Sequence, residues 1–210
     1  MRIPAPSAPA RLAVLASGGG SNAAALMAAC EDPAYGAEVV LVLTDRAGTG
    51  AEEHARRAGI PTAVIDLADH PDRESWDRQI ALTLGQAAPD LVVSAGFLKL
   101  LGTEVLSAFP GRIINTHNSL LPAFPGIHGP ADALAYGVRI AGATLFIVDG
   151  GVDTGPIIAQ CAVEVADDDT EDSLLERIKE SERAQLVEQV GQMSRRGWTI
   201  EGRRARPAGA

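Results

Sequence analysis

Aromatic side chains are scarce in this sequence, because Phe, Trp and Tyr together make up only 4% of its 210 residues. The core must therefore be filled mainly by Ala, Val, Leu and Ile, since hydrophobic residues still account for 46% of the chain. Aliphatic cores of this kind suit a parallel sheet covered by helices on its faces. The length also lies within the range of one α/β domain.

Cysteine is nearly absent as well, with only two in the chain. Cys30 lies in a segment expected to be helical and Cys161 in a segment expected to be a strand, without Cys-x-x-Cys spacing. This pattern suggests neither a disulfide framework nor a metal site, and it favours a reducing, cytoplasmic location.

Long apolar runs and excess positive charge are also missing. No segment approaches the roughly 20 apolar residues that cross a bilayer, and the net charge of −9 argues against nucleic acid as a main partner. Residues 1–10 are rich in Pro and Ala and are predicted to form a disordered tail without a signal peptide. Residues 11–206 contain no repeat or linker and are predicted to form a single domain. The arginines near the C-terminus are interpreted as solvated.

A glycine-rich turn follows the first predicted strand, residues 12–16. It reads Ser-Gly-Gly-Gly-Ser-Asn over residues 17–22, and helix-forming residues come next. Glycines let the backbone approach a ligand, and the free N–H groups of a helix start attract anions. The turn is therefore a candidate phosphate site, although a tight turn without a ligand has the same pattern. It matches neither the nucleoside triphosphate loop nor Gly-x-Gly-x-x-Gly.

Predicted strands and helices alternate along the rest of the chain. Strands are expected at residues 39–44, near 61, and at 91–94, 113–114, 140–148, 157–165 and 198–204. Helices are expected at residues 23–30, 50–58, 72–87, 131–136 and 170–192. Such alternation is typical of βαβ units, so the sheet is expected to be mainly parallel.

The segment 112–129 is the best candidate for a site. Ile113 and Ile114 predict a buried strand, and polar residues begin where that strand ends. Asn115 and His117 are two residues apart, so they should project to the same side at the edge where open α/β sheets bind ligands. Prolines at 122, 125 and 130 stiffen the loop that follows. On these residues alone, His117 could equally be a hydrogen-bonded core histidine.

The sequence from Asn115 to Pro122, followed by Pro125-Gly126, resembles the Asn-x-His-x-Ser-Leu-Leu-Pro block of folate-dependent formyltransferases. The resemblance covers residues 11–191. It implies a three-layer α/β/α domain with a mixed, mainly parallel seven-stranded sheet. By length and flanking motifs, the chain is most similar to the members that pass the formyl group of 10-formyltetrahydrofolate to the amine of glycinamide ribonucleotide. The products are formylglycinamide ribonucleotide and tetrahydrofolate, in de novo purine biosynthesis, and no metal is required.

The resemblance also implies roles for single residues. Asn115, His117 and Asp153 are expected to be catalytic, with Asp153 in a glycine-rich loop. The remaining roles concern binding: Gly20, Ser21 and Asn22 for the substrate phosphate, Glu182 for the substrate amine, and Arg73, Leu98, Lys99, Leu100, Leu101 and Asn115 for the folate. From the residues alone, the Asp153 loop could be a plain turn, Arg73 a surface arginine and Glu182 a solvated helical glutamate.

Three alternative functions stay open. Formyltetrahydrofolate hydrolase and methionyl-tRNA formyltransferase share the Asn-x-His and Asp motifs, although both usually carry another domain. A non-catalytic nucleotide-binding α/β protein would use only the glycine turn. The expected partners are glycinamide ribonucleotide and formyltetrahydrofolate, with no nucleic acid and no membrane. The sequence does not decide between a monomer and a homodimer.

Overall fold

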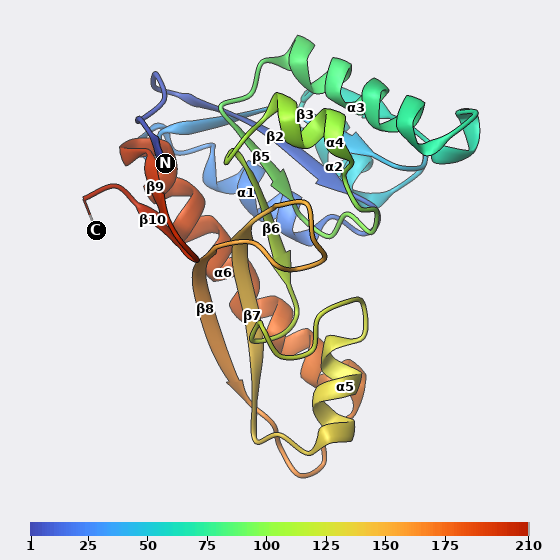
Figure 1. The fold of residues 1–210 in the computed structure, drawn as a ribbon, viewed down its shortest axis with the longest axis vertical. Coiled ribbons are helices and arrows are strands. Elements are labelled where there is room, and N and C mark those ends of the chain that lie inside the picture. The colour runs from blue at the N-terminus through green and yellow to red at the C-terminus, as the bar shows by residue number, and fades with distance from the viewer. Residues whose placement is uncertain (210) are drawn as a thin grey trace.

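The computed structural model describes residues 1–209, which are built around one ten-stranded sheet in the order β1-β9-β10-β8-β7-β6-β5-β2-β3-β4 (Figure 1). The strands are β1 Arg2–Ile3, β2 Ala10–Ala16, β3 Ala37–Thr44, β4 Thr62–Val64, β5 Leu91–Ser94, β6 Ile113–His117, β7 Ile140–Ile147, β8 Ile157–Glu164, β9 Trp198–Glu201 and β10 Arg204–Pro207. The helices are α1 Ser21–Ala29, α2 Gly50–Arg57, α3 Arg73–Ala87, α4 Thr103–Ala108, α5 Gly129–Tyr136 and α6 Glu171–Arg196, with short 3₁₀ turns at Pro33–Tyr35 and Leu67–Asp69.

Strands β2 to β6 run parallel to one another, whereas β7 is antiparallel to both of its neighbours, β6 and β8, and β8 is parallel to β10. The expected mainly parallel α/β/α architecture is therefore confirmed. The sheet has ten strands rather than the seven implied by the resemblance. The short strands β1, β9 and β10 extend it at one edge and account for the difference.

Helices cover both faces of the sheet. One core cluster joins the sheet to α1, α2 and α6, and the other joins it to α3 and α4. In α3 the apolar stripe of Trp76, Ile80 and Leu84 is fully buried, and Asp72 caps the helix by accepting from the Ser75 N–H at 2.7 Å. Aliphatic residues dominate both clusters, as the low aromatic content predicts.

Helix α6 is the longest element, and it begins with a capping box of Thr170 and Ser173. Its apolar stripe is fully buried and consists of Leu174, Ile178, Leu186 and Val190. The first two residues pack in a third cluster with α5, β7 and β8, and the last two pack in the cluster with α1 and α2. Among residues 1–209, none of the helices has the length and apolar character that crossing a membrane requires.

The N-terminal segment differs from the expected disordered tail. β1 pairs with β9 in antiparallel register, Ile3 is buried, and the terminal ammonium donates to the Ile200 carbonyl at 2.7 Å. A Pro- and Ala-rich composition carries no information about a pairing partner almost 200 residues away, which is why the pattern suggested disorder. Near the C-terminus, Arg204 and Arg206 are exposed as expected, but they belong to β10.

Candidate active site

The carboxyl end of β6 lies where the parallel part of the sheet meets its antiparallel part. Asn115 is in register with Ser94 of β5, and His117 is in register with Thr144 of β7. A cavity of about 380 Å³ opens at this edge, a volume within the usual range for small-molecule sites. It is lined by residues 94, 96–101, 115–118, 126, 127, 129, 146, 148, 151–153 and 182.

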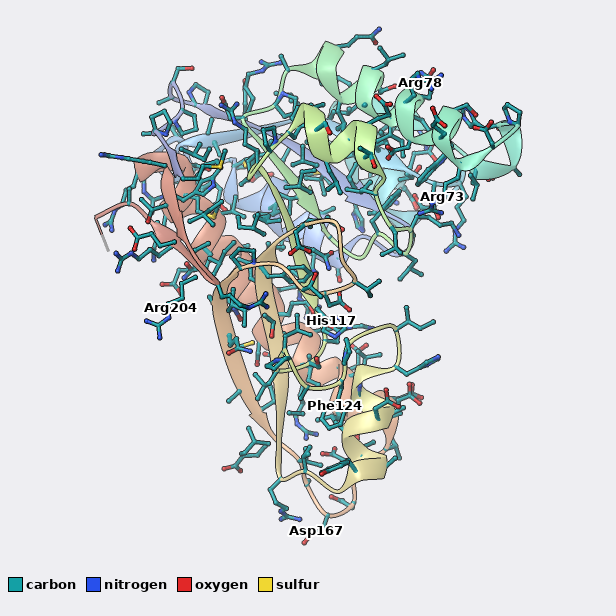
Figure 2. The ribbon with its side chains drawn as sticks, viewed as in Figure 1. Arg73, Arg78, His117, Phe124, Asp167 and Arg204 are labelled. Atoms are coloured by element: carbon teal, nitrogen blue, oxygen red, sulfur yellow. The ribbon has the colours of Figure 1, made fainter. Side chains whose placement is uncertain are left out.

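His117 is buried at the end of β6, and Figure 2 shows it next to Phe124 at the centre of the molecule. Its Nε2 lies 2.9 Å from the Phe124 carbonyl oxygen. Because a carbonyl only accepts, Nε2 must carry a proton in both charge states of the ring. The ring nitrogen that remains able to accept or release a proton is therefore Nδ1, which lies 3.7 Å from Asp153 Oδ2.

Asp153 adopts a left-handed backbone conformation, with φ of 53°, in the loop between β7 and β8. Its Oδ2 accepts from the Gly126 N–H at 2.8 Å. The loop is also a tight turn, because Asp149 accepts from the Thr154 hydroxyl at 2.6 Å. At Gly155 a Cβ atom would lie only 1.6 Å from the Ile147 carbonyl, so only glycine fits. The expected turn and the expected site residue thus occur in the same segment.

Glu182 lies on α6 and lines the cavity. It is only 5% exposed, its Oε1 accepts from the Asn22 amide at 2.5 Å, and its Oε2 has no hydrogen-bond partner among the described residues. Burial raises the pKa of the Glu182 carboxyl, opposed in part by the polar side chains of Thr116 and Asn22. A buried carboxylate with a free oxygen is suited to a cationic or N–H-donating ligand.

The glycine turn lies at the start of α1, next to this cavity rather than in its wall. Gly20 has φ of 72°, and a Cβ there would lie 2.5 Å from the Ala51 Cα, so no other residue fits. Gly19 faces open space, and Ser21 is exposed. Asn22 connects the turn to the cavity through its hydrogen bond to Glu182. This arrangement leaves backbone N–H groups at a helix start available to an anion.

One wall of the cavity is apolar. Leu98 and Leu100 are 67% and 58% exposed, and Ile127 and Val152 are also exposed at its rim. The side chain of Lys99 lies 4.0 Å from the buried Asp45 carboxylate. The sequence analysis did not identify the loop residues Ile127 and Val152 as site residues. The only sequence feature that could have indicated them is a large apolar side chain in a loop rich in glycine and proline.

Arg73 does not line the cavity. Its guanidinium donates to the Leu100 carbonyl and lies 5.4 Å from the centre of the Trp76 ring, and Figure 2 shows it well away from His117. Asp77 on the same helix accepts from the N–H groups of Gly102 at 2.6 Å and Glu104 at 2.8 Å. Helix α3 therefore holds the segment that forms the apolar wall.

The structure thus brings together Asn115, His117, Asp153, Glu182 and the segment 98–101 in one cavity. The glycine turn lies beside it, and Arg73 lies behind its wall. Within residues 1–209, no three side chains of His, Cys, Asp or Glu are grouped as ligands for a metal ion.

The sequence profile of one family, described as formyl transferase, matches residues 10–190. The chain belongs to the formyl transferase family. It is 54% identical to phosphoribosylglycinamide formyltransferase of Mycobacterium tuberculosis strain H37Rv, over 98% of this chain and 94% of that protein. It is 36% identical to the Escherichia coli K12 protein of the same name, over 82% of each chain.

Solved structures of the formyl transferase family have the same fold. The crystal structure of glycinamide ribonucleotide transformylase 1 from Symbiobacterium toebii superposes with a TM-score of 0.87 at 40% identity. The match covers 94% of this chain and 93% of the other. The similarity therefore extends over nearly the whole chain and is not limited to the segment around His117.

Proposed function

We propose that this chain transfers the formyl group of 10-formyltetrahydrofolate to the amine of glycinamide ribonucleotide. The observation that carries the proposal is one cavity holding Asn115, His117, Asp153 and Glu182 in a member of the formyl transferase family. The names of its relatives, matched over most of both chains, support the choice of substrates.

The reaction has three parts that the protein must assist. The substrate amine attacks the formyl carbon, the formyl oxygen takes up negative charge, and a proton passes from the amine to the departing folate nitrogen. Asn115 supplies amide N–H donors to that oxygen. His117 carries a fixed proton on Nε2 and an exchangeable one on Nδ1, and Asp153 stabilises the imidazolium form.

The two substrates are assigned to different parts of the site. The phosphate of the ribonucleotide is assigned to Gly20, Ser21 and Asn22, where a helix start meets a backbone that only glycine can adopt. Glu182 then faces the amine end, linked to the phosphate turn by Asn22. This hydrogen bond fixes the distance between the proposed phosphate site and the proposed amine site.

The folate is assigned to the apolar wall formed by Leu98, Lys99, Leu100 and Leu101, with Asn115 at its inner end. Arg73 is kept as a folate-binding residue on the basis of the resemblance. Its guanidinium donates to the Leu100 carbonyl, so it must break this hydrogen bond before it can contact the distal carboxylate of the folate. Lys99 offers an ammonium near the cavity mouth and lacks the planar fork of arginine. Residues 11–206 are proposed to work as one domain.

The free thiols Cys30 and Cys161 support a cytoplasmic location for the proposed reaction. The active form is either a monomer or a homodimer. Analytical ultracentrifugation of the active preparation will distinguish a working monomer from a homodimer.

The decisive experiment supplies purified protein with glycinamide ribonucleotide and 10-formyltetrahydrofolate. We expect formyl transfer to be faster than hydrolysis of the folate and faster than formylation of methionyl-tRNA. A preference for water or for tRNA as acceptor would replace the proposed substrate while keeping the chemistry. Binding of the nucleotide without folate binding or turnover would instead favour a non-catalytic nucleotide-binding protein, which tight folate binding would exclude.

Asp153→Asn tests the catalytic assignment. Asparagine tolerates the left-handed conformation at this position, so the substitution removes the charge with little backbone strain. We expect kcat to fall about 10²- to 10⁴-fold, the usual contribution of a positioned acid or base, with substrate dissociation constants close to wild type. The matched control is Asp167→Asn, an exposed aspartate at the far end of the β7–β8 hairpin (Figure 2).

A further inference from the structure

A row of three side chains crosses the sheet behind the cavity. His117 of β6 is in register with Thr144 of β7, which is in register with Gln160 of β8. Side chains that are directly opposite on neighbouring strands share one face of the sheet. Thr144 is 1% exposed, and neither Thr144 nor Gln160 lines the cavity. Thr144 therefore lies next to the proposed catalytic histidine, Gln160 lies one strand further along the sheet, and neither belongs to the cavity wall.

The Thr144 hydroxyl makes three hydrogen bonds, two with the loop that follows β6 and one with Gln160. It donates to the Ser119 carbonyl at 2.6 Å and accepts from the Leu121 N–H at 3.0 Å. It also accepts from Gln160 Nε2 at 3.0 Å, and the same nitrogen donates to the Leu121 carbonyl at 2.9 Å. One hydroxyl and one amide thus satisfy three backbone groups of a buried loop.

The loop held in this way leads directly to the histidine. Within it, the Ser119 hydroxyl donates to the Ala123 carbonyl at 2.7 Å, and the Ala123 N–H donates to the Leu120 carbonyl at 3.1 Å. The next carbonyl, that of Phe124, accepts from Nε2 of His117. A shift of the loop would therefore move the carbonyl that accepts from the imidazole.

The same loop also reaches the aspartate, because the Gly126 N–H donates to Asp153 Oδ2. We propose that Thr144 and Gln160 are positioning residues, which hold His117 and Asp153 in their working geometry by fixing residues 119–126. This inference rests on the proposed formyl transfer. It assigns a catalytic consequence to two residues that do not touch the reacting atoms.

Threonine at 144 is required for its hydroxyl rather than for its shape. Valine has nearly the same volume but leaves the Ser119 carbonyl and the Leu121 N–H without their buried partner. Serine restores the hydroxyl and loses only a methyl group. The pair Thr144→Val and Thr144→Ser therefore separates hydrogen bonding from packing. Gln160→Met removes the amide donors at an exposed position and provides a second variant, should Thr144→Val not fold.

The first measurement is the steady-state kinetics of formyl transfer. We expect Thr144→Val to lower kcat by about 10- to 100-fold with little change in KM, because a displacement of about 1 Å costs that much when reacting groups must be aligned. Gln160→Met should act in the same direction, and Thr144→Ser should regain most of the wild-type rate. A matched control is Thr170→Val, which removes the cap of α6; the Thr170 hydroxyl accepts from the Ser173 N–H, so its loss lowers stability without removing a hydrogen bond of the loop.

A double-mutant cycle distinguishes positioning from general destabilisation. If Thr144 acts through His117, Thr144→Val should have little further effect on kcat when His117 is already alanine. Full additivity of the two losses would overturn the proposal, as would a Thr144→Val enzyme with wild-type kcat.

The second measurement is independent of turnover. In the wild type the His117 Nε2 proton is hydrogen-bonded to a carbonyl, so its NMR signal should exchange slowly with water. We expect Thr144→Val and Gln160→Met to broaden or lose this signal, while Thr144→Ser and Thr170→Val retain it. If the wild type shows no formyl transfer, the proposed function fails, and this signal still tests the positioning. An unchanged signal in both loop variants would refute it.

Discussion

Glu182→Gln is the most informative single substitution, because it should make the protein more stable and less active. The wild-type carboxylate is buried, accepts one hydrogen bond from Asn22, and has one oxygen without a partner among the described residues. Glutamine keeps the shape and the acceptor for Asn22, and it replaces a buried charge by a neutral amide. Burying a charged group costs more than burying a neutral amide in the same place, because the charged group loses more hydration.

We therefore expect the free energy of unfolding at pH 8 to rise by about 1 to 3 kcal/mol in Glu182→Gln. For a protein of this size, each kcal/mol corresponds to about 2 to 4 °C in the melting temperature. The kinetic effect should be opposite, because the substrate amine loses a charge-assisted hydrogen bond worth about 1.5 to 3 kcal/mol. This predicts a loss in kcat/KM for glycinamide ribonucleotide of about 10- to 100-fold, with KM for the folate unchanged.

The stability gain should depend on pH in a defined direction. The pKa of Glu182 is raised above its ordinary value of 4.5 in the folded protein, so the folded state holds that proton more tightly than the unfolded chain. Wild-type stability therefore falls as the pH rises from the unfolded to the folded pKa. The advantage of Glu182→Gln should be small below pH 4.5 and should increase as the pH rises above it.

The assay is thermal unfolding across pH, run alongside steady-state kinetics. Glu180→Gln is the matched control, since Glu180 lies one half-turn away on α6 and is exposed. Equal melting temperatures for Glu182→Gln and wild type at pH 8, or a difference that increases on acidification, would refute the assignment of a costly buried carboxylate. Unchanged kinetics would remove Glu182 from the substrate site.

Three further predictions concern other parts of the molecule. Gly19→Val places a side chain in open space beside the glycine turn, so KM for the ribonucleotide should rise while KM for the folate does not; equal changes would argue against phosphate binding there. Asn118→Pro, which restricts the unfolded chain, should raise stability by about 0.4 to 1 kcal/mol in thermal unfolding, and a lower melting temperature would show that the local backbone is incompatible with proline. Asp169 accepts from Arg177 and Ser173, which keeps the pKa of its carboxyl well below the ordinary 3.8. Its stabilisation should be complete above that value and lost as the pH falls, so the melting temperatures of wild type and Asp169→Asn should converge in acid; a constant difference would contradict this.

The elements with strong local signals were predictable from the sequence. The stripes of α3 and α6 have helical spacing and polar caps at their starts, and both helices occur close to the predicted bounds. The position of His117 also followed from local rules, since a polar residue at the end of a buried strand lies at the ligand-binding edge of a parallel sheet. Periodicity was sufficient wherever one element determines its own buried face.

Contacts between distant segments were not predictable. Helix α4 was missed because Gly102 provides no side-chain cap, and the first N–H groups of α4 are instead satisfied by Asp77 of α3. The Phe124 carbonyl that orients His117 depends on a left-handed residue in a loop, which composition does not indicate. The sequence does not show which group the Arg73 guanidinium contacts, and only the fold shows that it donates to the Leu100 carbonyl.

Helix α6 has a consequence for how the protein unfolds. Leu174 and Ile178 belong to the cluster with α5, β7 and β8, whereas Leu186 and Val190 belong to the cluster with α1 and α2. Glu182 lies between these two pairs, on the stretch of helix that joins the two clusters. Neither cluster can lose its packing against the helix without releasing that stretch, so the two should melt as one cooperative unit. Affinity for the ribonucleotide should consequently disappear in the same transition that unfolds the two clusters.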